Sequence, residues 1–259
     1  PSTAGYTAYL DELARRRITL DDNNDTQNAP LTLVPQRTFY PQPNGLSTGT
    51  QGVNYFRGGD TISNLTGILQ YSFSEWRIRP TNTITFTPAN PRPTVAPTVT
   101  GDITVASFNV LNYFTSIDTT SSSSSGSCAP SGTEDCRGAD SNAELTRQTD
   151  KLVSALDGID ADIFGLIELE NTTATGTISA LIGSLNAVAG AGTYDFVDTG
   201  STLGTDAIRV AFIYKPSVVQ PVGTPLVDTD SIHNRPPTAV LFEVVDVTNQ
   251  SFGEQFYVV

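Results

Sequence analysis

The pattern of apolar and polar positions divides the chain into two regions of different texture. Residues 1 to about 80 contain short β-like runs separated by Asn, Pro and Gly, and only YLDELARRR near the start has helical character. Residues 81 to about 100 are threaded with proline, which favours an extended connection. The pattern therefore predicts a small β-rich module over 1–80, a Pro-rich linker over 81–100 and a second domain over 101–259.

Strands and helices alternate in the second domain. DITVASFNVLNYF reads as a strand, and SNAELTRQTDKLVSALDGID follows as an amphipathic helix that Ser141 and Glu144 open as a capping box. Its apolar face is predicted to consist of Leu145, Thr149, Leu152, Leu156 and Ile159. The next apolar run, ADIFGLIELEN, is too continuous for a half-exposed strand and is typical of an interior one.

A second helix is predicted in TISALIGSLNAVAG, and three further strands follow in AIRVAFIYKP, PTAVLFEVVDV and EQFYVV. The apolar face of this helix consists of Ile178, Leu181, Ile182, Leu185 and Val188. This order of elements predicts an α/β (α+β) two-sheet sandwich. The chain begins at Pro1 without Met and ends inside an apolar β run at Val259, so we expect it to be a piece of a longer polypeptide.

Acidity narrows the classes of ligand. The chain has 14 Lys and Arg against 27 Asp and Glu, a net charge of −13, which argues against a broad basic groove. A polyanionic substrate would need a divalent metal or a few placed arginines to neutralise charge locally. No apolar stretch approaches 18 residues, so no transmembrane segment is predicted.

Two cysteines, Cys128 and Cys136, lie in a Ser/Gly/Pro-rich loop. Two cysteines without a nearby histidine make a poor zinc site, so a small disulfide loop is favoured, with two free thiols as the alternative. Exposed paired cysteines, few lysines and acidity together indicate a secreted, extracellular or cell-surface protein.

The most informative polar residue is Glu168, at the end of the predicted interior strand. A buried carboxylate is costly unless it is paired or metal-bound, and ligands collect at strand ends of α/β sheets. Strand alternation would place Glu168 and Glu170 on one face, while Asn109 ends the preceding strand. From spacing alone, a solvated strand end for both glutamates and a turn-forming role for Asn109 remain open.

Four segments in this order resemble the endonuclease/exonuclease/phosphatase superfamily: SFNVLNYF, DADIFGLIELEN, TDAIRVAFIYKP and NRPPTAVLF. The intervening CAPSGTEDCRGAD extends the resemblance to secreted bacterial extracellular nucleases of that superfamily. The resemblance covers roughly residues 102–259. Residues from about 14 to 80 resemble the OB-like module that precedes the catalytic domain in that group.

The resemblance implies a role for individual residues. Glu168 matches the Mg²⁺-binding glutamate, with Mn²⁺ or Ca²⁺ as alternative ions, and Asn109 matches an asparagine that contacts phosphate and supports the metal. Glu170 lies beyond that position. Arg235 falls where relatives have a phosphate-facing arginine, with a structural role at the core edge as the alternative. Asp206 is expected at the rim of the site, with an ordinary turn aspartate as the alternative.

Members of the family continue with segments that this chain lacks: an Asn-His strand, a Gly-Asp-Phe-Asn segment and a terminal Asp-His pair. The single histidine, His233, matches none of them. The resemblance implies a divalent-metal-dependent phosphodiester hydrolase, a secreted nuclease acting on DNA, with RNA as an open alternative. The general base and the catalytic histidine would then come from the remainder of the polypeptide beyond Val259, and the chain alone would be inactive.

Two alternatives stay open. One is an extracellular phosphatase or phospholipid phosphodiesterase of the same superfamily, which the acidity favours over a nucleic-acid substrate. The other is a noncatalytic extracellular binding or matrix protein that keeps the fold.

Overall fold

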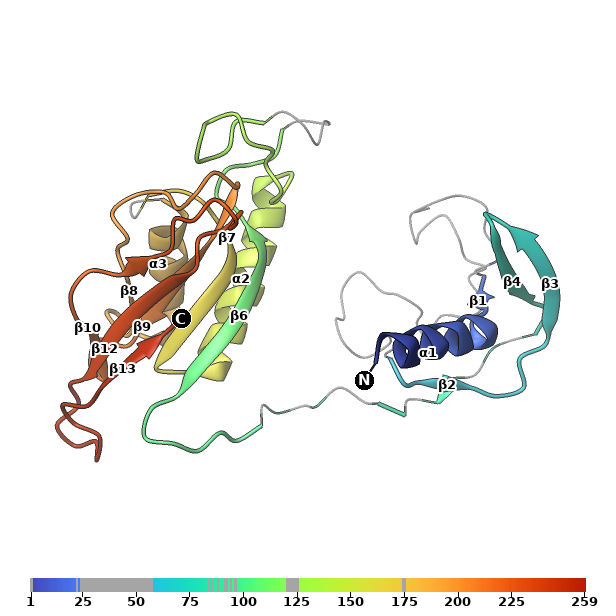
Figure 1. Cartoon of the computed structure of the whole chain (residues 1–259), viewed down its shortest axis with the longest axis horizontal. Coiled ribbons are helices and arrows are strands. Elements are labelled where there is room, and N and C mark those ends of the chain that lie inside the picture. The colour runs from blue at the N-terminus through green and yellow to red at the C-terminus, as the bar shows by residue number, and fades with distance from the viewer. Residues whose placement is uncertain are drawn as a thin grey trace. The chain divides into compact units, whose positions relative to one another are not determined.

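The computed structural model of the chain divides into two compact units, Pro1–Val95 and Ala96–Val259, which are described separately (Figure 1). The residues that the structure describes are 2–21, 23, 58–82, 84, 86, 87, 89, 90, 93, 95, 97–119, 126–173 and 176–259.

The described part of the first unit contains one helix and short strands. Helix α1 (Thr3–Arg16) begins at Ser2, whose hydroxyl accepts a hydrogen bond from the backbone N–H of Gly5, as an N-cap does. Its strands are β1 (Thr19–Leu20), β2 (Thr61–Ile62), β3 (Gly67–Ser72), β4 (Glu75–Pro80) and β5 (Phe86–Thr87). They pair as β1-β4-β3 and as β2-β5. About half of the expected OB-like module lies outside the described residues, so the module stays a prediction.

The residues described in the second unit form two four-stranded sheets. The strands of the first sheet are β6 (Val105–Tyr113), β7 (Ile163–Glu170), β8 (Asp195–Phe196) and β9 (Ile208–Tyr214), in the order β6-β7-β9-β8. Strands β6 and β7 are parallel, whereas β7 and β9 are antiparallel. The strands of the second sheet are β10 (Val219–Pro221), β11 (Leu226–Val227), β12 (Thr238–Val244) and β13 (Gln255–Val258). Strands β10, β11 and β13 each pair with β12.

Two hydrophobic layers hold these sheets in place. Helices α2 (Asn142–Ile159) and α3 (Thr177–Ala189) pack on one face of the first sheet, where Leu156, Leu166 and Leu181 are fully buried. On the other face, Phe212 of β9 packs against Phe242 of β12. The layers therefore run helices, sheet, sheet (Figure 1), and the predicted α/β two-sheet sandwich is confirmed.

The predicted helices and long strands of this unit are confirmed, including the cap of α2, where Ser141 Oγ accepts from the N–H of Glu144. Two expected core residues, Ile159 and Val188, are instead 42% and 61% exposed. Both lie in the last turn of their helices, where no further helical turn shields them. The short strands β8, β10 and β11 were not predicted, because two or three residues are too few to show a period of two.

Candidate functional site

Adjacent bulges mark the carboxyl ends of the parallel strands β6 and β7. In the register of the pair, Asn109 lies opposite Ile167 and Tyr113 opposite Leu169, so three residues of β6 face one residue of β7, Glu168. The backbone is left-handed at Leu111 (φ 56°), Asn112 (φ 48°) and Glu168 (φ 69°). Each such residue costs about 1–2 kcal/mol in an L-amino acid, and strain of this kind clusters at functional sites.

The bulge in β7 reverses the faces of the strand. Leu166 and Leu169 both belong to the core beneath the helices, although they are three residues apart rather than two. The shift falls before Leu169, which separates Glu168 from Glu170, so the expected alternation of the two glutamates to one face stays a prediction. Glu168 is half-buried, whereas Glu170 is fully buried.

Glu168 and Asn109 both lie at the bulges, and Asn109 pairs with Ile167, the residue before Glu168. Oε2 of Glu168 accepts a hydrogen bond of 3.2 Å from the backbone N–H of Asn112. Oδ1 of Asn109 accepts one of 2.7 Å from the N–H of Leu111, so it supports the left-handed turn. Among the described residues, no hydrogen bond involves Oε1 of Glu168, and that oxygen is available to a ligand.

Glu170 has a different environment. Its Oε2 accepts hydrogen bonds from the backbone N–H groups of Thr115 (2.9 Å) and Ser116 (3.3 Å) and from the hydroxyl of Thr177 (2.6 Å). A solvated strand end is therefore excluded for Glu170, which is 0% exposed. These hydrogen bonds connect the segment after β6 to the first residue of α3. Glu170 therefore stabilises the backbone next to the candidate site rather than binding a ligand.

Asp206 lies between two arginines. Its Oδ1 is 3.1 Å from Nη1 of Arg137, and its Oδ2 is 3.2 Å from Nε of Arg235. Its Oδ1 also accepts from the N–H of Ile208, as a turn aspartate does, so the ion pairs and the turn coexist. No hydrogen bond of the described residues uses the terminal Nη groups of Arg235, which are left for a ligand.

The cysteines form the predicted disulfide, Cys128–Cys136, and its burial was not expected. Cys128 and Cys136 are 0% and 3% exposed and pack against Phe114, Ala207 and Ile208. The loop folds back onto the start of β9, which removes the bridge from solvent. Because Arg137 directly follows Cys136, the bridge also holds this arginine beside Asp206.

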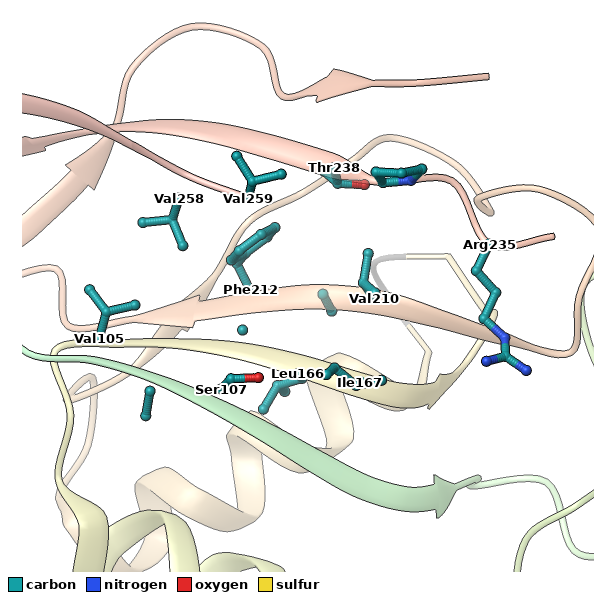
Figure 2. Close-up of a pocket in the computed structure, with 14 residues that line it drawn as sticks. Val105, Ser107, Leu166, Ile167, Val210, Phe212, Arg235, Thr238, Val258 and Val259 are labelled. Carbon is teal, nitrogen blue, oxygen red and sulfur yellow. The ribbon is translucent and has the colours of Figure 1, made fainter. Parts of the chain in front are cut away.

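A hollow of about 490 Å³ lies between the sheets of the second unit (Figure 2). Its wall is mainly apolar, with Val105, Val258 and Val259 at one end and Phe212 near the middle. Arg235 lies at the other end, beyond Ile167 and Val210. Ile167 directly precedes Glu168, so the charged end of this inter-sheet hollow adjoins the bulges.

A second hollow, of about 370 Å³, lies beside the β6 bulge and was not predicted. We call it the basic pocket, and its lining consists of Leu111, Asn112, Arg137, Gly138, Ala139, Glu144, Arg147, Gln148 and Lys151. Three of these side chains are cationic. The sequence did contain a signal, the i,i+4 spacing of Arg147 and Lys151 on the polar face of a predicted helix, but that spacing does not reveal which strand the face adjoins.

Arg209 is another functional-looking residue that sequence reasoning missed. It is 5% exposed and donates to the carbonyls of Thr172 and Ser201 and to the hydroxyl of Thr199. Burial lowers the pKa of its guanidinium below the ordinary value. Its donors are used to hold the loop before β9, so its role is structural.

His233 lies in the loop before β12. Its Nε2 is 3.3 Å from Oδ2 of Asp228, and its backbone N–H donates to Asp230 O. These contacts are local to the loop, as is usual for a lone loop histidine.

The side-chain oxygens at the bulges are suitable ligands for a hard cation such as Mg²⁺. Within the described residues, no group of three or more His, Cys, Asp or Glu gathers that could hold a metal ion by itself. Mg²⁺ needs less, since it keeps several waters and binds through one or two carboxylates together with substrate phosphate. Glu168, whose Oε1 accepts no hydrogen bond among the described residues, fits that smaller requirement.

Among the comparisons with known proteins, only the search of solved structures found matches. The sequence matches no protein-family model and no curated protein sequence. It is similar to the structure of an endonuclease/exonuclease/phosphatase family protein from Bacteroides thetaiotaomicron, with 15% identity, a TM-score of 0.34, and coverage of 60% of this chain and 49% of that chain. It is also similar to a mannosyl-6-phosphatase from the same organism, with 16% identity, a TM-score of 0.34 and coverage of 60% and 50%. The chain thus spans about half the length of these structures.

Proposed function

We propose that the second unit carries the metal-binding and phosphate-orienting part of a divalent-metal-dependent phosphodiesterase site, and that its substrate is nucleic acid. The observation that carries the proposal is the contact of the two bulges at the carboxyl ends of parallel strands, where the N–H of Asn112 donates to Glu168 and Asn109 pairs with Ile167, the residue before Glu168. Ligands of α/β sheets collect at such strand ends. The resemblance of the strand segments to endonuclease/exonuclease/phosphatase sequences supports the same proposal.

Each group has a defined task in this proposal. Glu168 would hold the cation, which when bound supplies charge to a nonbridging phosphate oxygen. The Asn109 side chain can donate to a second phosphate oxygen. The free Nη groups of Arg235 can donate to the same phosphate, because Asp206 engages only its Nε. Asn112 orients Glu168 through its backbone N–H.

Titration with Mn²⁺ tests the metal site. We expect Glu168→Gln to weaken Mn²⁺ binding by about tenfold or more, measured by calorimetry on the full chain, because it removes the carboxylate charge. Glu254→Gln is the matched control, since Glu254 is exposed and immediately precedes β13. Equal affinities for the wild type and the Glu168→Gln variant would refute the proposed metal site.

Activation of water needs a group that these residues do not offer. Asp206 is neutralised by two arginines, and His233 is engaged with Asp228. We therefore expect the chain to bind metal and DNA but to leave supercoiled plasmid uncut. Mg²⁺-dependent cleavage by the purified chain, abolished by Glu168→Ala, would contradict this expectation.

A small phosphoester is the second candidate substrate, in line with the phosphatase named among the similar structures. The acidity of the chain favours it, because a net charge of −13 repels a polyanion at long range. Competition separates the two candidates: a hexose 6-phosphate that displaces labelled DNA at equal concentration would favour the phosphatase.

We propose that the protein acts outside the cytoplasm. The disulfide supports this, since such bonds persist in oxidising compartments. Within the described ranges, no helix combines the length and apolarity needed to cross a membrane. Detecting the protein in culture supernatant of its source with the disulfide intact would test the proposal, and finding it only in the cytosol would refute it.

A further inference from the structure

Positive charge in the second unit is scarce and gathered in one place. Residues 96–259 contain six Lys and Arg against twenty Asp and Glu, a net charge of −14. Arg209 is buried, and Lys215 pairs with Asp160 and Asp162. Three of the remaining four cations, Arg137, Arg147 and Lys151, line the basic pocket. On a surface of this sign, such a concentration creates a local site for an anion.

Two of these cations have no acidic partner. Arg147 and Lys151 are exposed one turn apart on α2, and neither takes part in a salt bridge among the described residues. Like charges at this spacing disfavour the helix, and within the described ranges no ion pair offsets this repulsion. Arg137 shares its charge with Asp206. The pocket's own carboxylate, Glu144, accepts from the N–H of Asp140 at the start of α2.

The basic pocket is coupled to Glu168 through the β6 bulge. Leu111 and Asn112 line the pocket, and the N–H of Asn112 donates to Glu168. From the helix side, Nε2 of Gln148 donates to the carbonyl of Leu111 at 2.8 Å and to that of Val110 at 3.3 Å. Gln148 lies between Arg147 and Lys151 in sequence, so the cations of α2 are held against the same turn that orients Glu168.

We propose that the basic pocket binds a backbone phosphate of nucleic acid next to the phosphodiester bound at Glu168. This inference rests on the proposed function of the Glu168 site. A guanidinium and an ammonium without acidic partners, with a second guanidinium nearby, are the donors that phosphate groups require. A small phosphoester has a single phosphate, which the cation at Glu168 and the side chain of Arg235 would bind. A second cationic site, the basic pocket, therefore fits a substrate that carries several phosphates along a chain.

Salt-dependent DNA binding by the full chain tests the inference. A fluorescein-labelled single-stranded oligodeoxynucleotide is titrated in EDTA by anisotropy, at several salt concentrations. We expect the double variant Arg147→Gln/Lys151→Gln to bind about tenfold more weakly at low salt, with a log–log salt slope shallower by roughly 1.4, because two phosphate contacts are lost. Arg147→Lys/Lys151→Arg keeps both charges and should retain most of the affinity.

The matched control is Arg15→Gln/Arg17→Gln. It changes the net charge equally at two exposed arginines of the first unit, and we expect it to alter affinity less than about twofold. Unchanged binding by the pocket variant with an unaltered circular dichroism spectrum, or equal losses in both double variants, would overturn the inference. Displacement of the oligonucleotide by inorganic phosphate at comparable concentration would also overturn it, since the pocket would then serve a small anion.

Metal titration separates this inference from the function on which it rests. If Glu168→Gln leaves Mn²⁺ binding unchanged while the pocket variant loses DNA affinity, the phosphate pocket stands and the phosphodiesterase site fails. If only the Glu168 variant has an effect, the metal site stands and the pocket fails.

Discussion

The backbone N–H of Asn112 donates a hydrogen bond of 3.2 Å to Oε2 of Glu168, and both residues have left-handed backbones. This bond joins the bulge of β6 to the bulge of β7. It orients a carboxylate by a main-chain group rather than by a side chain, so the orientation depends on the strained turn of Leu111 and Asn112. The turn also lines the basic pocket, which links the two proposed ligand sites.

The strain at Leu111 can be tested with two truncations. Leu111 is 74% exposed at φ 56°, so Ala and Gly both remove little buried surface. We expect Leu111→Gly to be more stable than Leu111→Ala by about 1 kcal/mol, because glycine adopts left-handed backbone without a Cβ clash. Urea unfolding measures the difference, and equal stability of the two variants would show that this backbone is not strained.

Asp206 forms ion pairs with two arginines and offsets part of their positive charge. We expect Asp206→Asn to raise DNA affinity by about threefold and to steepen the salt slope, because Arg137 and Arg235 are released for phosphate contacts. Anisotropy titrations over a salt series test this. The converse variant, Arg235→Gln, should lower affinity, and weaker binding by the Asp206→Asn variant would contradict the assignment.

Glu170 is predicted to stabilise the fold. Replacement by Ala would leave the donors of Thr115, Ser116 and Thr177 without their acceptor, at a cost of about 3 kcal/mol or more in unfolding free energy. Glu170→Gln keeps one acceptor oxygen, so we expect a smaller loss. Chemical denaturation, with Glu254→Gln as the exposed control, measures both effects, and a loss below that of the control would refute this role.

The disulfide has a predicted effect on both stability and binding. Replacing Cys128 and Cys136 by Ser should lower the unfolding free energy by about 2–3 kcal/mol for a loop of this length. Because Arg137 follows Cys136, DNA affinity should fall as well. Thermal melts and anisotropy with and without reductant test the two effects, and DNA affinity unaltered by reduction would show that the bridge does not position Arg137.

Alkaline pH is predicted to weaken the fold through Tyr194. Burial, followed by the charges of Asp160, Asp162 and Asp157, raises the pKa of this phenol far above its ordinary value of 10.0. A raised pKa in the folded state means that the stabilisation is complete below pH 10 and declines as the pH rises above it, since the unfolded chain then releases the proton first. Tyr194→Phe should reduce this decline, as measured by urea unfolding between about pH 8 and 11. If the unfolding free energy of the wild type and of the Tyr194→Phe variant declined equally with pH, Tyr194 would not be the source of the decline.

Much of the second unit was predictable from the sequence. The pattern of apolar positions identified α2, α3, β6, β7, β9 and β12, because burial of one helix face leaves a repeating signal and burial of both faces of a strand leaves a continuous apolar run. Glu168, Asn109, Asp206 and Arg235 were identified as candidates through strand-end position and through resemblance, and their roles remain proposals. The disulfide was predicted from composition and spacing.

Tertiary structure decided how these residues are arranged. The bulge at Glu168 interrupts the strand alternation, so that Leu166 and Leu169 both face the helices. The two arginines on Asp206 come from loops 98 residues apart, and the basic pocket joins a helix face to a turn of β6. A linear sequence determines local periodicity because it depends on neighbours a few residues away. Bulges, burial of the disulfide and convergence of charges depend on long-range packing, which only the folded chain specifies.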